Sequence, residues 1–308
     1  MEVILRIFPT PIHDMLRKKL TDRWTSLEEI RLRLQQPIEL IFQDKVEWLE
    51  GILFQAEDSS YILNQLSNHS LYRMETELKE GYITIQGGHR VGLAGKVIFK
   101  NSEEVQLQDI TFFNIRIAKE VVGVATPILP YIYENDMIQN TLIIGPPKTG
   151  KTTIIRDLAR LISSGNTHYQ SLKIGVIDER SEIAAAMEGV PQLQVGGRTD
   201  VLDACPKVTG MMMMIRSMSP DVLIVDEIGK QADIDAITEA MLSGVSIIST
   251  IHGHSLSLLL KRPSIQALLK NNVFTRIITL SAKNNEAIEV EVMDAQGNEM
   301  ATHLILKQ

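Results

Sequence analysis

The stretch Gly145-Pro146-Pro147-Lys148-Thr149-Gly150-Lys151-Thr152 fits the pattern G-x-x-x-x-G-K-[ST] at every fixed position. An apolar, β-branched run at 141–144 precedes it and predicts a strand, and apolar residues at helical spacing follow it over 153–162. A glycine-rich loop between a strand and a helix turns backbone N–H groups toward phosphates, and the helix N-terminus adds to the attraction for anions. The sequence therefore predicts a nucleotide-binding loop.

Two residues of this loop have specific expected roles toward ATP and Mg²⁺. We expect Lys151 to neutralise the β- and γ-phosphates and Thr152 to hold Mg²⁺ through its hydroxyl. The other residues expected to contact the nucleotide are Gly145, Pro146, Pro147, Lys148, Thr149, Gly150 and Thr153.

Acidic residues end two further apolar runs that predict strands. The run 221–225 ends in Asp226 and Glu227, which we assign to the metal ion and to the general base that activates water. The run 173–177 ends in the acidic segment 178–182, whose Glu179 is the alternative base, because ligands of parallel sheets bind beyond the carboxyl ends of strands. The same segment could instead cap a helix and hold Arg180 in an ion pair.

A fourth apolar run, 244–250, leads into His252 and His254. Its position at a strand end favours Thr250 and His252 as sensors of the γ-phosphate, and a solvent-facing pair of histidines is the alternative. Neither histidine has cysteine or carboxylate companions at the spacing of a structural zinc site.

Composition limits the class of protein. The chain has 308 residues, enough for two domains, and 44% of them are hydrophobic. It carries a net charge of −7, with 15 basic against 20 acidic residues before position 139, so we expect no nucleic-acid partner. The chain has a single cysteine, Cys205, and neither an apolar run long enough to span a membrane nor a signal peptide. We therefore expect a cytosolic protein.

The order of patterns predicts two domains. Residues 1–138 mix helical spacing (11–20 and 58–79) with strand patterns (27–34, 38–42, 82–85, 90–99 and 111–117), which predicts a smaller α+β domain. Residues 126–137 predict a short helix that crosses to the second domain. From 139 to 308, apolar strands alternate with helices, which predicts an α/β domain with a parallel sheet covered on both faces. Residues 274–280 predict one more strand, and 287–306 a hairpin.

The motifs occur in the order found in the secretion-type ATPases of type II and type IV secretion and of pilus retraction, and the chain resembles them. Several stretches resemble one family in that group more closely, stage III sporulation protein AA. These stretches are 29–33, 87–95, 114–118, 197–203 and 205–211. The sequence departs from the common secretion-ATPase pattern at Asp226, where glycine is usual, and at Arg180, where proline is usual.

The resemblance implies a RecA-like phosphate-loop ATPase core behind a smaller N-terminal domain. It also implies a ring, a hexamer, with ATP between subunits and arginines reaching the phosphates from a neighbouring domain or subunit. Our candidates for these arginines are Arg90, Arg116 and Arg198. The implied function is a Mg-dependent ATPase that powers or assembles a channel between mother cell and forespore. It would dock on membrane proteins from the cytosol on the mother-cell side.

Two other functions stay open at this stage. One is a ring ATPase that acts on nucleic acid, which the acidic charge of both parts of the chain disfavours. The other is a scaffold that binds ATP through Lys151 but turns it over slowly.

Overall fold

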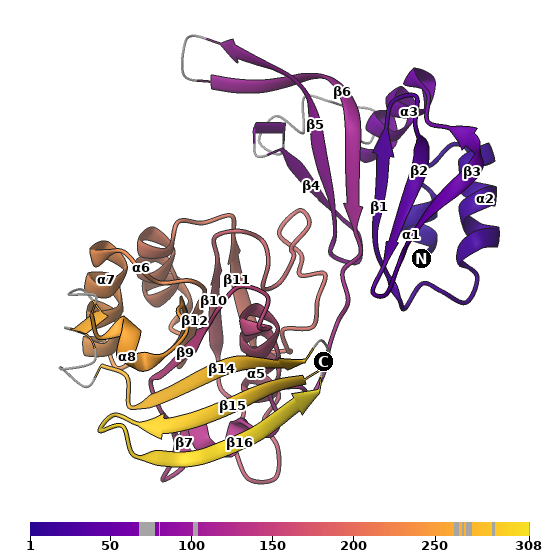
Figure 1. The fold of residues 1–308 in the computed structure, drawn as a ribbon. Helices are drawn as coiled ribbons and strands as arrows, with labels where there is room; N and C mark the ends of the chain where they lie inside the picture. Colours follow the sequence, from indigo (N-terminus) through magenta and orange to yellow (C-terminus); the bar gives the residue numbers. More distant parts are fainter. Residues whose placement is uncertain are drawn as a thin grey trace. The chain divides into compact units, whose positions relative to one another are not determined.

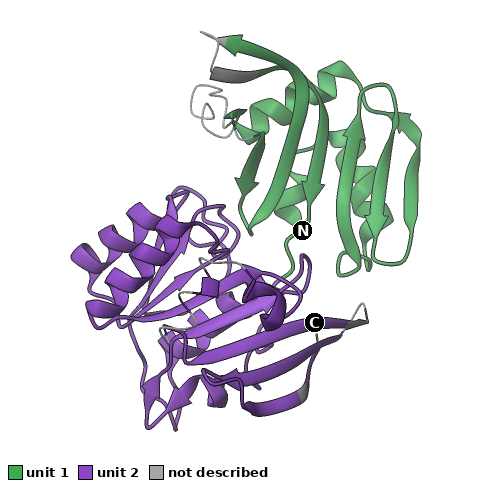
Figure 2. Ribbon diagram, turned by 60° about the vertical axis from the view of Figure 1, so that its left-hand side comes forward, with its two compact units in different colours: residues 1–119 green, residues 120–308 purple. Residues whose placement is uncertain are grey.

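The computed structural model describes residues 1–67, 78–79, 81–100, 104–261, 265–266, 268, 273–284 and 287–307. These residues form two compact units, unit 1 (residues 1–119) and unit 2 (residues 120–308), shown in separate colours in Figure 2. Each unit has its own sheet and its own hydrophobic core, so each is described separately. No helix in the described part of the chain is long and apolar enough to cross a membrane.

Unit 1 is an antiparallel sheet with helices on one face. Its strands lie in the order β3-β2-β1-β6-β5-β4. The strands are β1 (Leu27–Arg33), β2 (Pro37–Phe42), β3 (Val46–Leu53), β4 (Tyr82–Ile85), β5 (His89–Lys100) and β6 (Glu104–Arg116). The helices are α1 (Glu2–Leu5), α2 (Thr10–Leu20) and α3 (Ala56–Leu66).

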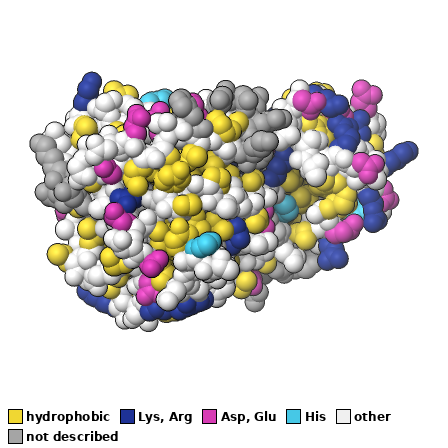
Figure 3. Space-filling model, turned by 90° about the horizontal axis from the view of Figure 1, so that it is seen from below, with side chains coloured by type: hydrophobic (Ala, Val, Ile, Leu, Met, Phe, Trp, Pro, Cys, Tyr) yellow, Lys and Arg dark blue, Asp and Glu magenta, His cyan; other side chains and the backbone are white. Residues whose placement is uncertain are grey.

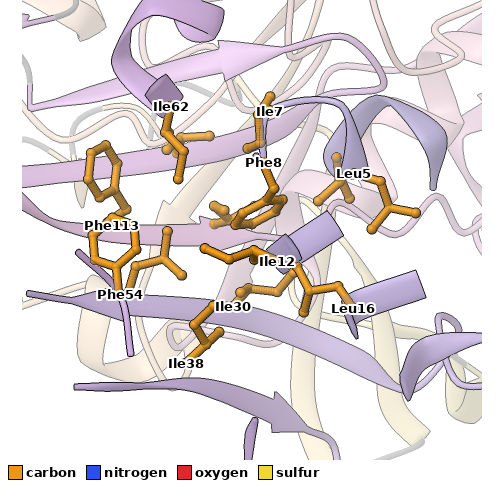
Figure 4. Packing of buried hydrophobic residues seen from close by; sticks show 14 of the residues in the cluster. Leu5, Ile7, Phe8, Ile12, Leu16, Ile30, Ile38, Phe54, Ile62 and Phe113 are labelled. Carbon is orange, nitrogen blue, oxygen red and sulfur yellow. The ribbon is translucent and has the colours of Figure 1, made fainter. Parts of the chain in front are cut away.

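The core of unit 1 follows from alternation along its strands. In β2, alternate residues Ile38, Leu40 and Phe42 are buried, while the residues between them are partly exposed. Buried residues of α1 and α2 pack over this face together with Phe54 and Phe113 (Figure 4). The two phenylalanine rings meet edge to face, with centroids 5.8 Å apart.

Unit 2 is built on a mixed sheet in the order β11-β10-β12-β13-β9-β14-β15-β16 (Figure 1). Neighbouring strands from β11 to β14 are parallel, and β15 and β16 continue the sheet antiparallel. The parallel strands are β9 (Thr141–Gly145), β10 (Ile174–Asp178), β11 (Thr199–Asp203), β12 (Val222–Val225), β13 (Ser246–His252) and β14 (Arg276–Asn284). The antiparallel strands are β15 (Ala287–Asp294) and β16 (Glu299–Lys307).

Helices cover both faces of this sheet. Every residue of β9, β10 and β12 is buried, as expected for strands packed on two sides. Buried residues of α5 (Lys151–Ser164) share one core with one face of the sheet. Those of α6 (Lys207–Met218), α7 (Gln231–Leu242) and α8 (Leu256–Leu259) share a second core with the other face. Because these strands are parallel, their carboxyl ends lie at the same end of the sheet.

The segment before β9 differs from the sequence-based expectation. We expected a domain boundary near residue 138, whereas the two units divide between 119 and 120. Residues of 124–133 are buried in the core that contains α5, and the Asp157 carboxylate accepts hydrogen bonds from the N–H groups of Gly123 and Ala125. Instead of a helix over 126–137, the chain forms the 3-10 turn η2 (Leu129–Ile132) and the short strands β7 (Tyr133–Glu134) and β8 (Met137–Ile138).

Two other differences concern unit 1. Strand β3 was not expected, because its apolar residues alternate poorly and Gly51 interrupts it with a φ of 88°. The helix expected over 58–79 is found as α3 up to Leu66, and its continuation over 68–77 lies outside the described residues.

Candidate active site

The predicted phosphate loop, residues 145–152, connects β9 to α5. Lys148 and Gly150 adopt left-handed conformations, with φ of 63° and 73°, so the chain turns tightly before the helix. Gly145 must lack a side chain, because a Cβ there would lie 2.5 Å from the Thr149 hydroxyl. That hydroxyl donates to the carbonyl oxygen of Pro146 at 2.7 Å and closes the loop. The local sequence therefore forms a tight turn between strand and helix, and phosphate binding by this loop stays a prediction.

Lys151, the first residue of α5, points back into this loop. Its ammonium donates to the carbonyl oxygens of Gly145 and Pro146, each at 2.9 Å. The residue is only 7% exposed, and burial lowers the pKa of the ammonium, partly offset by Glu227 and Asp226. The Lys151 ammonium is thus held inside the loop by two uncharged carbonyl oxygens, which phosphate oxygens could replace.

Asp226 follows β12 and joins two hydroxyl groups. The Thr152 hydroxyl donates to Oδ2 of Asp226 at 3.0 Å, and the Thr250 hydroxyl donates to Oδ1. Mg²⁺ prefers hydroxyl and carboxylate oxygens, and it commonly keeps several waters. Because the Thr152 and Asp226 oxygens are adjacent beside the phosphate loop, this pair fits such an ion. Among the described residues, no cluster of three or more His, Cys, Asp or Glu could hold a metal on its own.

Glu227 comes next and has an unusual backbone conformation. Its φ is 47°, a left-handed value that is uncommon for a residue other than glycine. Its side chain is 38% exposed, and the carboxylate lies 2.8 Å from Nη1 of Arg180. The alternative base, Glu179, forms an ion pair with Lys207 from the start of α6. Both candidate carboxylates thus carry a cationic partner.

The rest of the acidic segment is structural in its contacts. Asp178 is fully buried, and its carboxylate accepts hydrogen bonds from the N–H groups of residues 182, 183 and 184. Burial raises its pKa, although these three bonds act in the opposite direction. Arg156 of α5 donates to the carbonyl oxygens of residues 182 and 183. No helix begins here in the described structure, so Asp178 caps a turn rather than a helix.

The histidine and the arginines proposed from sequence lie in different places. His252 is exposed at the end of β13, paired in the ladder with Gly145, and its ring centroid is 6.4 Å from that of His254. Arg90 and Arg116 belong to unit 1, where they are direct partners across β5 and β6. Arg198 lies at the amino ends of β10 and β11, the edge opposite Asp226, and donates to Ser171.

The start of α5 and the ends of β12 and β13 therefore bring together Lys151, Thr152, Asp226, Glu227 and Thr250.

The sequence matches the family described as "Sporulation stage III, protein AA" over residues 1–300. The chain belongs to the stage III sporulation protein AA family. Stage III sporulation protein AA of Bacillus subtilis is 50% identical over 298 residues, which cover 97% of this chain and 96% of that protein. An uncharacterised protein, ycf45, of Porphyra purpurea is 24% identical over 87% of this chain and 43% of its own length.

Solved structures show that this member of the family has the secretion-ATPase fold. The Legionella pneumophila ATPase DotB superposes with a TM-score of 0.59 at 13% identity, covering 94% of this chain and 81% of DotB. The pilus retraction motor PilT with bound ADP gives a TM-score of 0.62 at 13% identity, covering 91% of this chain and 82% of PilT. The RecA-like core with a smaller sheet unit before it, which the family resemblance implied, is confirmed.

Sequence reasoning missed two residues that shape the site, Arg156 and Lys207, and it named Thr250 without its contact to Asp226. All three depend on contacts between elements far apart in the chain. Lys207 lies in the first turn of α6, where a helix usually favours acidic residues and not basic ones. Nothing in the neighbouring sequence indicates that its partner is Glu179.

Proposed function

We propose that this protein is a Mg-dependent ATPase of the secretion type that works as a ring motor in sporulation. The observation that carries the proposal is the 3.0 Å contact between Thr152 of α5 and Asp226, which follows β12. It joins the phosphate cradle to an acid at the carboxyl edge of the sheet, the arrangement that phosphoryl transfer to water requires. Membership of the sporulation family supports the setting.

In the proposed mechanism, the loop N–H groups and Lys151 bind the β- and γ-phosphates of ATP. To do so, the ammonium exchanges the carbonyl oxygens of Gly145 and Pro146 for phosphate oxygens. Thr152 and Asp226 are the residues that would hold Mg²⁺, which neutralises phosphate charge when it is bound. The contact that Asp226 makes with Thr152 keeps both oxygens ready on one side of the loop.

We assign the activation of water to Glu227. Its carboxylate accepts the proton from water after it separates from Arg180, and Arg180 at 63% exposure can move aside. Glu179 is the alternative, held by Lys207 in the same way. His252 is proposed to respond to the γ-phosphate, because its strand position is next to Gly145.

The charge that develops on the γ-phosphate calls for arginine. We propose that Arg90 and Arg116 supply it from a neighbouring subunit of a hexameric ring, with unit 1 as the moving part. The side chain of Arg116 is exposed at the end of β6. Arg198 is a weaker candidate, because its guanidinium already donates to Ser171. In the cell, the ring would dock from the cytosol on membrane proteins of a channel between mother cell and forespore.

One observation favours a second function, an ATP-dependent scaffold with little turnover. The carboxylate of Glu227, to which we assign the activation of water, forms an ion pair with Arg180. If ATP did not break this pair, the protein would bind nucleotide and hydrolyse it slowly.

Replacement of Lys151 by alanine tests the proposal at its first step. We expect Lys151→Ala to weaken ATP binding ~10–100-fold, as befits the loss of a charged group from a desolvated phosphate site. Binding is measured by calorimetric titration of the full chain with ATP and Mg²⁺. The control is Lys173→Ala, which removes a lysine at the opposite edge of the sheet, where it pairs with Asp221. Equal affinity of the Lys151→Ala variant and the wild type for ATP would contradict the proposal.

A further inference from the structure

Thr250 is a fully buried residue of β13 that touches both acids of the site. Its hydroxyl donates to Oδ1 of Asp226 and accepts a hydrogen bond from the N–H group of Glu227 at 2.8 Å. Its carbonyl oxygen accepts from the N–H group of Ile228 at 2.9 Å. One residue therefore binds three consecutive residues of the chain that carries the acids.

These contacts begin where the regular sheet ends. The parallel ladder between β12 and β13 runs from Val222 and Ser246 to Val225 and Ser249. Beyond Val225 the chain leaves the sheet, because Glu227 takes a left-handed conformation. A left-handed backbone costs a residue with a side chain free energy, and it persists where neighbouring contacts determine it. The two N–H groups bound by Thr250, on either side of the Glu227 carbonyl, provide those contacts.

The Thr250 hydroxyl contacts the two acids, which points to a role different from the γ-phosphate sensing that its position in the sequence suggested. A threonine hydroxyl has a single proton, and that proton is already given to Asp226. With Thr152 on the other oxygen, the Asp226 carboxylate is fixed by two hydroxyl groups from two different elements. Groups that orient a metal-binding carboxylate in this way tune how tightly the metal is held.

We infer that Thr250 is a positioning residue that sets the orientation of the Asp226 carboxylate and the backbone of Glu227 together. It thereby couples the affinity for Mg²⁺ to the placement of the base. The inference rests on the proposed function, since it concerns the same nucleotide site. Its distinctive consequence is that the hydroxyl of Thr250 matters for Mg²⁺ and not for ATP itself.

The test uses Thr250→Val, which keeps the shape of the side chain and removes the hydroxyl, and Thr250→Ser, which keeps the hydroxyl. A fluorescent ATP analogue is titrated into the full chain in EDTA and then at increasing Mg²⁺. For Thr250→Val we expect the half-saturating Mg²⁺ concentration to rise ~10-fold or more, with unchanged affinity in EDTA. Thr250→Ser should restore the wild-type Mg²⁺ dependence.

Ser249→Ala is the matched control. Ser249 is equally buried in the same strand, but its hydroxyl donates to the carbonyl oxygen of Val225 at 2.8 Å and touches neither acid. We expect this variant to lower the melting temperature and to keep the wild-type Mg²⁺ dependence. An equal shift in Ser249→Ala would overturn the inference, because it would then reflect the loss of any buried hydroxyl.

The outcomes separate this inference from the proposed function. Wild-type Mg²⁺ dependence in Thr250→Val, with the protein folded, overturns the role of Thr250 alone. If the wild type binds the analogue no better with Mg²⁺ than in EDTA, the proposed function fails instead. Should Thr250→Val not fold, Thr250→Ala removes the same hydroxyl with less bulk and gives the same comparison.

Discussion

His89 in unit 1 is a half-buried histidine with a defined acceptor role. Its Nδ1 accepts a hydrogen bond from the N–H group of Ala118 at 3.0 Å, close to the end of unit 1. An imidazole that accepts at Nδ1 is not protonated there. Burial lowers the pKa of His89 from 6.5 to about 4, so the ring stays neutral at neutral pH. The contact thus fastens the last residues of unit 1 to β5.

The lowered pKa of His89 predicts how unit 1 responds to acid. The unfolded state takes up a proton near pH 6.5 and the folded state only near pH 4, so stability present above pH 6.5 is lost as the pH falls to about 4. We expect a loss of about 1–2 kcal/mol over this window, because one pKa unit corresponds to about 1.4 kcal/mol and solvent around the half-buried ring reduces the effect. The variant His89→Asn should lack this component.

Tryptophan fluorescence can follow this effect, since both tryptophans, Trp24 and Trp48, belong to unit 1. Urea unfolding of the wild type and of His89→Asn is compared at pH 7 and pH 4.5. The same decrease in both proteins would show that other groups cause it.

Sequence patterns suffice to predict the proximity of candidate site residues that belong to local motifs. Lys151 and Thr152 belong to one continuous motif, and Asp226 and Glu227 end an apolar strand, so their proximity could be expected from sequence patterns alone. The ion pairs of Glu227 and Glu179 could not, because their partners Arg180 and Lys207 are set by tertiary packing. The catalytic roles of these residues stay predictions.

Strand β10 and helix α6 pack closely at Gly175. Gly175, the second residue of β10, is buried, and a Cβ there would lie 2.5 Å from Cγ of Met214 and 2.8 Å from a methyl group of Leu223. The methionine run of α6 thus packs directly against the strand that ends in Asp178. Closely packed interiors respond to an added methyl group by displacement of backbone and side chains.

We expect Gly175→Ala to destabilise unit 2 by about 1–3 kcal/mol, the usual cost of overpacking. Differential scanning calorimetry measures the change. Gly197→Ala is the control, because a Cβ at Gly197 would meet nothing within 4 Å and its φ is not positive. Equal stability of Gly175→Ala and the wild type would show that α6 shifts at no cost.

Periodicity predicted most elements, and its failures have physical causes. Strands β9, β10 and β12 could be predicted because they are almost wholly apolar and buried. The parallel strand β11 was missed, because Asp200 and Asp203 interrupt its apolar pattern and none of its residues is fully buried. The segment 120–138 was not, because its apolar residues pack against α5 without regular helical hydrogen bonds and two prolines interrupt it. The apolar residues of 120–138 reflect burial alone, and their spacing was misinterpreted as that of a helix.

At the scale of the whole molecule, charge separates the candidate functions. The net charge is −7, and on the face drawn in Figure 3 the described lysines and arginines lie among acidic side chains. A nucleic-acid binder usually presents a basic stripe that neutralises phosphates. The ring ATPase acting on nucleic acid is therefore disfavoured, and single- or double-stranded DNA should leave the ATPase rate unchanged.

The most direct test is the release of phosphate from ATP by the full chain with Mg²⁺, measured for the wild type, Glu227→Gln and Glu179→Gln. We expect Glu227→Gln to bind ATP but to release phosphate at least ~100-fold more slowly, the typical loss on removal of a general base. Glu179→Gln should stay near the wild-type rate. Slow release in Glu179→Gln with full activity in Glu227→Gln would contradict the assigned base, and no Mg-dependent release by the wild type would contradict the ATPase itself.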